Sequence, residues 1–251
     1  SAINAFVYII IKEKFDEGIR LSYSETENVL KVSDIQHPIL RNALKFSNFK
    51  EPVEIISIAD IPSSGTGLGS SSSFTVGLLK ALNKFKNVDF KREKLAELAC
   101  DIEINLCGSP IGKQDQYAAV FGGLRIYKFN KDDSVDIEKI EISSDVSDSL
   151  DNEIISFYVG GNRNANEILA DQQKQLVNKD KVNAMKRMVD LVFELKKELE
   201  NNNLDSFGEI LHENWNLKKE MTKNIANTRI NEIYKIAMDN GAKGGKLLGA
   251  G

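Results

Sequence analysis

Histidine and cysteine are both scarce in this sequence, with two of each among 251 residues. The thiols, Cys100 and Cys107, are too few to form a four-ligand metal site by themselves, and their number fits a protein kept in a reducing compartment. The histidines, His37 and His212, lie far apart and have no motif around them. A zinc site is therefore not expected.

An excess of positive charge and long apolar runs are also missing. The formal net charge is −4, whereas proteins that bind nucleic acid usually carry a basic face, so a general nucleic-acid binder is not expected. A phosphorylated small molecule needs only local positive charge. The longest apolar run, Phe6–Ile11, is far too short to span a bilayer, and residues 1–5 lack the basic segment of a signal peptide. We expect a cytoplasmic protein without a membrane partner.

What remains is an ordinary globular composition, 41% hydrophobic and 28% charged, at a length that fits one large domain or two modest ones. Strand and helix patterns mix in the first half of the chain, and helical patterns dominate the second half. The acidic, polar stretch Asp145–Asn152 marks the change and predicts two domains, 1–150 and 151–251. Both ends look cut, because the chain has no initiator Met and stops inside a glycine-rich loop, so we expect a fragment.

Apolar and alternating runs predict the strands, the first two of which are expected to pair as a hairpin across the turn at Asp16–Gly18. These strands are Phe6–Lys12, Ile19–Tyr23, Val53–Ala59, Leu124–Phe129, Val135–Ile142 and Ile154–Val159. Apolar residues at helical spacing predict the helices. These helices are Pro38–Phe46, Ser72–Phe85, Arg92–Leu106, Lys113–Phe121, Ala165–Leu176, Val182–Leu199, Leu204–Thr222 and Ile230–Asn240.

The most informative stretch is residues 61–74, IPSSGTGLGSSSSF. Glycines permit positive φ angles, so that backbone N–H groups can converge on one point, and a helix start adds unpaired N–H groups and the positive end of its dipole. Together they predict a phosphate site, with serine hydroxyls that can cap the helix or bind Mg²⁺. The alternative is a flexible loop with a serine N-cap. The stretch is neither a Walker A loop nor the GxGxxG dinucleotide fingerprint.

Three stretches together resemble a known family. Pro62–Ser71 resembles the PxxxGLGSS motif of the GHMP kinases, the superfamily of galactokinase, homoserine kinase and mevalonate kinase. Cys107–Tyr117 is similar to the stretch that carries the catalytic aspartate of its sugar kinases, and Lys246–Gly251 looks like the start of its third, glycine-rich motif. The family's first motif has no counterpart here. The resemblance implies an α+β, two-lobed GHMP kinase fold, with an N-terminal lobe like ribosomal protein S5 domain 2 and a ferredoxin-like C-terminal lobe.

Within that family, the stretches Ile19–Ser24, Gly112–Gly123 and Phe157–Leu169 resemble the heptose 7-phosphate kinases. This resemblance implies ATP-dependent phosphorylation of the anomeric hydroxyl of D-glycero-D-manno-heptose 7-phosphate. One alternative is a GHMP kinase for another acceptor, such as fucose, galactose or a mevalonate derivative. Another is a catalytically idle regulator that binds nucleotide or sugar. The oligomeric state cannot be read from the sequence.

The family resemblance places the catalytic base at Asp115, which would orient the acceptor hydroxyl and take its proton. It assigns Mg²⁺ to Ser71 and Glu103, in keeping with a cation that uses one or two protein ligands besides phosphate oxygens and water. The alternatives are an aspartate that caps a short helix and a glutamate on a solvated helix face. The presence of all three residues weighs against the idle regulator.

The resemblance also assigns residues that bind the two substrates. Those expected to contact ATP phosphates, chiefly through backbone N–H groups, are Gly65, Gly67, Leu68, Gly69, Ser70 and Ser71, joined from the second glycine loop by Gly245, Gly249 and Gly251. Those expected on the acceptor side are Arg163, Lys113, Tyr23 and Ser24. An arginine fork suits a phosphate or vicinal hydroxyls, but Arg163 could equally be a surface residue, and Tyr23 and Ser24 could be ordinary strand residues.

Overall fold

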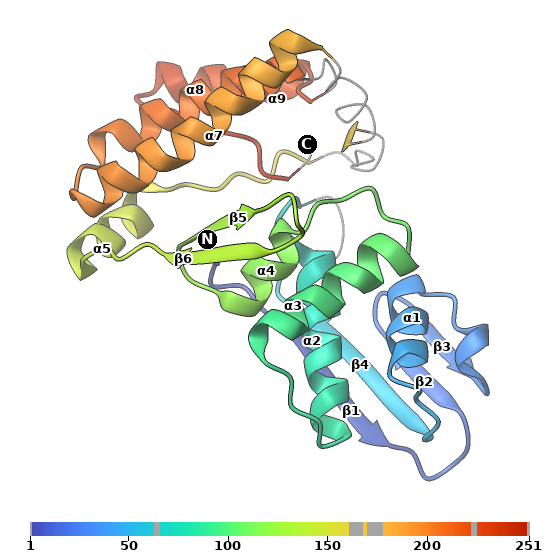
Figure 1. Cartoon of the computed structure of the whole chain (residues 1–251). Coiled ribbons are helices and arrows are strands. Elements are labelled where there is room, and N and C mark those ends of the chain that lie inside the picture. The colour runs from blue at the N-terminus through green and yellow to red at the C-terminus, as the bar shows by residue number, and fades with distance from the viewer. Residues whose placement is uncertain (1, 63–65, 161–167, 170–177, 222–224, 250–251) are drawn as a thin grey trace. The chain divides into compact units, whose positions relative to one another are not determined.

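The structure is a computed structural model that describes residues 2–62, 66–160, 168–169, 178–221 and 225–249. It divides into two compact units, 1–123 and 124–251 (Figure 1). The division falls earlier in the chain than the expected domain boundary after residue 150. The reason is that Ile126 and Ile140, at the hairpin after residue 123, share a core with Val146 and Leu199 of the second unit.

A four-stranded sheet forms the centre of the first unit. Its strands are β1 (Val7–Glu13), β2 (Ile19–Ser22), β3 (Thr26–Val29) and β4 (Val53–Ala59), in the order β1-β4-β2-β3. The predicted pairing of the first two strands is wrong, because β4 lies between them, antiparallel to β1 and parallel to β2. The wide turn after β1 leaves room for this strand: Lys14 N–H donates to the Pro52 carbonyl (3.0 Å) and Val53 N–H to the Gly18 carbonyl (3.2 Å).

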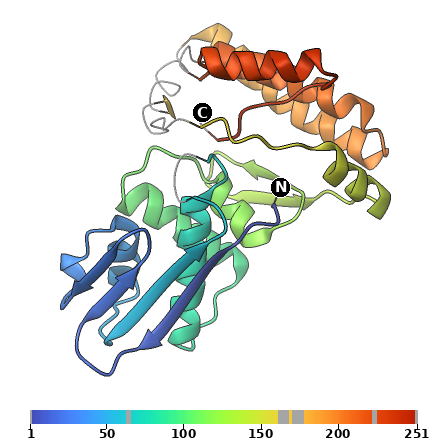
Figure 2. The same cartoon turned by 180° about the vertical axis from the view of Figure 1, so that it is seen from behind.

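Helices cover one face of this sheet, as the two opposite views show (Figures 1 and 2). They are α1 (Pro38–Phe46), α2 (Ser70–Phe85), α3 (Arg92–Cys100), a π-helical turn η2 (Asp101–Leu106) and α4 (Gln114–Phe121), with a short 3₁₀ turn η1 (Val32–Asp34) before α1. Alternate strand residues point into the core, where Leu21 and Val53 meet Leu44 of α1 and Leu78 of α2. The sequence predicted these helices but missed β3 and η1.

The second unit contains the hairpin of β5 (Arg125–Phe129) and β6 (Val135–Lys139) and the helices α5 (Ser144–Glu153), α7 (Lys179–Glu200), α8 (Asp205–Met221) and α9 (Thr228–Asp239). The hairpin and the last three helices confirm the predictions. The acidic stretch predicted as a boundary is the helix α5, which Ser143 caps by accepting a hydrogen bond from Val146 N–H (3.3 Å).

The predicted strand Ile154–Val159 is wrong, since these residues form no strand. The segment pairs with no other strand of the described chain, and Ile155 and Tyr158 are both 71% exposed. Within its described part, the sheet of the second unit is two-stranded. The predicted helix Ala165–Leu176 lies outside the described residues, apart from Ile168 and Leu169. None of the helices that the structure describes combines the length and apolarity needed to cross a membrane.

The segment after α9 lies unusually close to α8. A Cβ atom added to Gly244 would lie 1.8 Å from the Gly208 carbonyl oxygen of α8 and 3.0 Å from His212 Cβ. Nearby, Trp215 of α8 is buried with Ile230 of α9. Only a residue without a side chain allows this contact between backbones.

Replacing Gly244 by alanine is therefore expected to destabilise the second unit by about 1–3 kcal/mol, because the segment must move away from α8. Trp215 is the single tryptophan of the sequence, so its fluorescence in a urea titration reports the unfolding of this unit. Gly245→Ala is the matched control, because its Cβ would meet Tyr234 Cε2 at an ordinary 3.7 Å. Equal midpoints for the two variants would contradict the prediction.

Candidate active site

The glycine loop ends at the start of α2 in the way the phosphate-site prediction requires. Gly67 and Gly69 have φ angles of +66° and +70°, in the left-handed region that favours glycine. Gly69 is the N-cap of α2, and none of the described side chains caps this helix start. The first N–H groups of α2 are thus available to an anion, and the helix dipole favours negative charge there.

The Ser70 side chain forms hydrogen bonds with residues of the glycine loop. Its hydroxyl donates to the Pro62 carbonyl (3.2 Å) and lies 3.3 Å from the Thr66 hydroxyl. Leu68 N–H bonds to the same threonine oxygen at 3.4 Å. These bonds connect Pro62, Thr66 and Leu68 to the first residue of α2.

Glu103 is the centre of a hydrogen-bond cluster beneath this loop. Its side chain is 1% exposed. The Ser71 hydroxyl donates to its Oε1 atom, and the Ser72 hydroxyl (2.8 Å) and the Gln116 amide donate to its Oε2 atom. A buried carboxylate is tolerated when such donors satisfy it. The predicted pair of Ser71 and Glu103 is therefore in direct contact.

The π-helical turn η2 explains why Glu103 points inward. Regular helical spacing predicts Leu106 on the buried face with Ile102, and Glu103 at its edge. The structure instead buries Ile102 and Glu103, both 1% exposed, and leaves Leu106 49% exposed. The wider turn shifts the register by part of a residue, and such turns are frequent at functional sites. The Asn42 amide holds the end of this turn through the Leu106 carbonyl (3.1 Å).

Asp115 lies in the first turn of α4 and packs against the glycine loop. A Cβ atom added to Gly69 would lie 3.4 Å from Asp115 Cγ and 3.5 Å from its Oδ2 atom. Although the residue is exposed to solvent, protein atoms crowd around its carboxyl group. This desolvation, followed by the negative charge of Glu103, raises the pKa of Asp115 above its ordinary value.

Of the residues predicted to bind the acceptor, Lys113 lies near Asp115 in the chain, whereas the Tyr23 side chain bonds to Glu27. Lys113 immediately precedes α4 and is two residues from Asp115. Tyr23 donates a hydrogen bond to Glu27 (2.9 Å) and its ring meets the His37 ring edge-on at 4.8 Å. Burial and the bond to Glu27 raise the pKa of Tyr23 to about 12. Its hydroxyl is thus used within the fold, and Ser24 beside it is exposed.

Three other predicted residues, Gly65, Arg163 and Gly251, lie outside the described residues. Gly245 and Gly249 belong to the second unit, where the Gly249 carbonyl accepts a hydrogen bond from Lys218. Their contact with nucleotide stays a prediction.

Sequence reasoning missed two members of the cluster, Ser72 and Gln116, which are 3% and 0% exposed. Ser72 lies three residues before the buried Thr75 and seven before Leu79, so it is a hydroxyl on the apolar face of α2. A polar residue at an apolar position of a helical pattern is the signal that could have found it.

The donor set fits Mg²⁺, which prefers oxygen ligands. Ser71 and Glu103 offer one hydroxyl and one carboxylate oxygen, and a metal bound by both would replace their hydrogen bond. Among the described residues, no group of three or more His, Cys, Asp or Glu side chains could hold a metal ion. A magnesium ion that relies on phosphate oxygens and water for its other ligands needs no such group.

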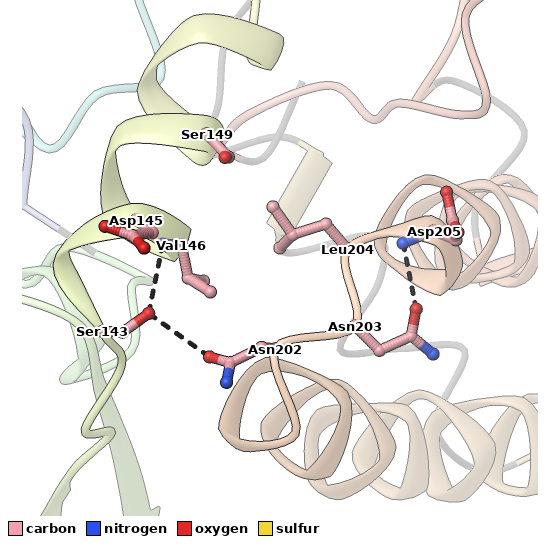
Figure 3. Close-up of a pocket in the computed structure, with 8 residues that line it drawn as sticks. All are labelled: Ser143, Asp145, Val146, Ser149, Asn202, Asn203, Leu204 and Asp205. Atoms are coloured by element: carbon pink, nitrogen blue, oxygen red, sulfur yellow. Dashed lines mark hydrogen bonds between the residues drawn. The ribbon is translucent and has the colours of Figure 1, made fainter.

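A pocket of about 450 Å³ in the second unit is not part of this site. It lies between α5 and the loop from α7 to α8 (Figure 3). Several of its polar atoms serve as caps and turns; for example, Asn203 Oδ1 accepts a hydrogen bond from Asp205 N–H at 3.2 Å. The described residues that line it include Asp145 and Asp205 and no positively charged residue, so it does not suit a phosphate.

Kinases of a sugar and of a sugar phosphate are similar to this chain in sequence. Over 193 residues the chain is 32% identical to the D-glycero-alpha-D-manno-heptose 7-phosphate kinase of Campylobacter jejuni, covering 77% of this chain and 57% of that protein. It is 30% identical over 214 residues to a galactokinase of Pyrococcus furiosus, covering 74% and 58%. The chain thus spans less than two thirds of either relative.

A solved structure gives the same fold. The D-glycero-D-manno-heptose 1-phosphate kinase from Bacteriodes thetaiotaomicron matches with a TM-score of 0.76 at 23% identity, over 99% of this chain and 75% of that one. The GHMP kinases N terminal domain matches residues 35–123, and the GHMP kinases C terminal domain matches residues 195–251. Two matches that together take in more than half of the sequence, and a fold shared with solved kinases of this kind, confirm the resemblance: the chain belongs to the GHMP kinases.

Proposed function

We propose that this chain carries the active site of an ATP-dependent sugar-phosphate kinase, which converts D-glycero-D-manno-heptose 7-phosphate to the 1,7-bisphosphate. The observation that carries the proposal is the grouping in one unit of three features: a helix start that no described side chain caps, the hydrogen-bonded pair of exposed Ser71 and buried Glu103, and the Asp115 carboxylate. An anion site beside a carboxylate base is what phosphoryl transfer to a hydroxyl needs.

Each residue then has one task. The N–H groups that follow Gly67 and Gly69 bind the phosphates of ATP and stabilise the charge that develops on them. Asp115 accepts the proton of the acceptor hydroxyl and holds the oxygen toward the γ-phosphate. A raised pKa makes this carboxylate a stronger base than an ordinary aspartate, and therefore better suited to the task near neutral pH.

Ser71 and Glu103 would hold Mg²⁺, which neutralises charge on the β- and γ-phosphate oxygens when it is bound. Lys113 is proposed to contact the acceptor phosphate, because it brings a cation within two residues of the base. Arg163 is kept as a second candidate for that phosphate on sequence grounds. Tyr23 is less suited to the acceptor, since its hydroxyl already bonds to Glu27.

The acceptor is tested by measuring ADP release with ATP and Mg²⁺. The heptose 7-phosphate is expected to give a kcat/KM at least about 100-fold above those of galactose, fucose and mevalonate, because a site built for a phosphate loses its partner when that group is missing. Mannose 6-phosphate is the matched control for a sugar phosphate of another length, and phosphorus NMR identifies the anomeric phosphate. Preference for galactose, the substrate named in the relative of Pyrococcus furiosus, would favour another acceptor.

A further inference from the structure

Gln116 is a fully buried amide that makes one visible polar contact. It is 0% exposed, and its Nε2 group donates to Glu103 Oε2. Its Oε1 atom is buried and has no hydrogen-bond partner among the described residues. The negative charge of Glu103 explains this orientation, because the flipped amide would turn one oxygen toward another.

Such an arrangement is costly to fold. A buried amide oxygen without a partner lowers the stability of the fold, and an apolar side chain of similar size would avoid that loss. The Ser72 hydroxyl already donates to Glu103 Oε2 at 2.8 Å. Gln116 is thus a second donor to an atom that has one, which points to a role in orienting the carboxylate.

The position of Gln116 in α4 relates the orientation of the Glu103 carboxylate to the proposed base Asp115. It follows Asp115 in the chain, and the two side chains reach different parts of the site: Asp115 lies against Gly69, and Gln116 reaches Glu103. A single helical turn therefore connects the proposed base with the proposed metal ligand. With Oε2 held by Ser72 and Gln116, Glu103 Oε1 is the oxygen that faces Ser71.

We propose that Gln116 is a positioning residue, which fixes the Glu103 carboxylate so that its Oε1 atom and Ser71 can bind the metal together. This inference rests on the proposed function, because it needs a metal at Ser71 and Glu103. Groups that orient a metal ligand without touching the metal typically contribute 10- to 100-fold to its affinity.

The test is the affinity of the protein for Mn²⁺, used as the probe, in the presence of ADP and followed by electron paramagnetic resonance. Gln116→Met keeps the volume and removes the donor, and it is expected to raise the Mn²⁺ dissociation constant about tenfold or more. The affinity for ADP measured in EDTA is expected to stay unchanged. A substitution that disrupted the whole site would weaken this metal-free binding as well. Ser72→Ala removes the other donor to Oε2 and is expected to act in the same direction.

Gln114→Met is the matched control, because it makes the same substitution in the same turn at an exposed residue. It is expected to bind Mn²⁺ like the wild type. Wild-type affinity in both Gln116→Met and Ser72→Ala would overturn the inference and leave the proposed function intact. A wild-type protein that binds ADP but no Mn²⁺ would instead overturn the proposed metal site, and the inference with it.

Discussion

Replacing Asp115 by asparagine is expected to lower kcat about 10²- to 10⁴-fold, because a positioned general base contributes that much to the rate. The amide can still accept a hydrogen bond but cannot take the proton. Binding of ATP is expected to change little, since the loop N–H groups are untouched. The measurement is ADP release at saturating ATP and acceptor, with nucleotide affinity from isothermal titration.

Asp89→Asn is the control, because Asp89 is an exposed residue in the connection between α2 and α3. It makes the same chemical change without touching the glycine loop. Wild-type turnover in Asp115→Asn would contradict the mechanism. An inactive wild type that binds ATP would instead favour the idle regulator.

The same variant should be more stable than the wild type at neutral pH. Desolvation and the charge of Glu103 raise the pKa of Asp115 in the folded protein, so the ionised carboxylate is disfavoured by folding. That penalty is fully present above the raised pKa and disappears as the pH falls through it. Calorimetry should therefore give Asp115→Asn a higher Tm than the wild type at pH 7, with the difference vanishing in acid. Equal Tm values at both pH values would show that the carboxyl is not desolvated.

Local pattern predicted the helices well, because the apolar spacing of α2 or α8 is contained within one segment of sequence. The order in which strands pair was harder to predict from the sequence. The alternation in Ile19–Tyr23 shows that a strand exists, but nothing in it shows that residues 53–59 separate it from β1. The run Ile154–Val159 was misread for the same reason, since an apolar run becomes a strand only where another strand pairs with it.

The candidate site was predictable to the extent that it follows motifs. The family motifs that contain Ser71 and Asp115 predicted these two residues, and the resemblance predicted Glu103 from its spacing to Asp115. The structure brings Ser71 and Glu103 into contact and places Asp115 beside Gly69. The depth of Glu103 was not predictable, because the expected helix assumed 3.6 residues per turn and η2 departs from it. Gln116 was missed because its partner is thirteen residues away and belongs to another element.

Gly69 is the residue where a single methyl group should have a large effect on activity. Its φ of +70° is unfavourable for alanine by about 1–2 kcal/mol, and the new Cβ would lie 3.4 Å from both Cβ and Cγ of Asp115. At this ordinary contact distance the methyl group would touch the carboxylate, and any movement of the loop that relieves the unfavourable φ would displace it. A misplacement of about 1 Å near the reacting atoms can lower the rate about 100-fold, so Gly69→Ala is expected to lower kcat by that factor.

Gly123→Ala separates strain from crowding. Gly123 has a similar φ of +65°, and, its two chain neighbours aside, no atom of the described residues lies within 4 Å of where its Cβ would be. It is expected to lose stability and to keep its kcat. If both glycine variants lose activity equally, crowding against Asp115 is not the cause.

A double-mutant cycle shows whether Gly69→Ala lowers kcat through Asp115 or independently of it. If Gly69→Ala acts by displacing the base, adding it to Asp115→Asn should cost much less than the 100-fold expected alone, since residues that act as a unit are not additive. Additive losses would mean that Gly69 acts on the phosphates through the loop backbone, independently of Asp115. The glycine would then be required for binding the donor, and the 3.4 Å approach to the carboxylate would be incidental to the rate.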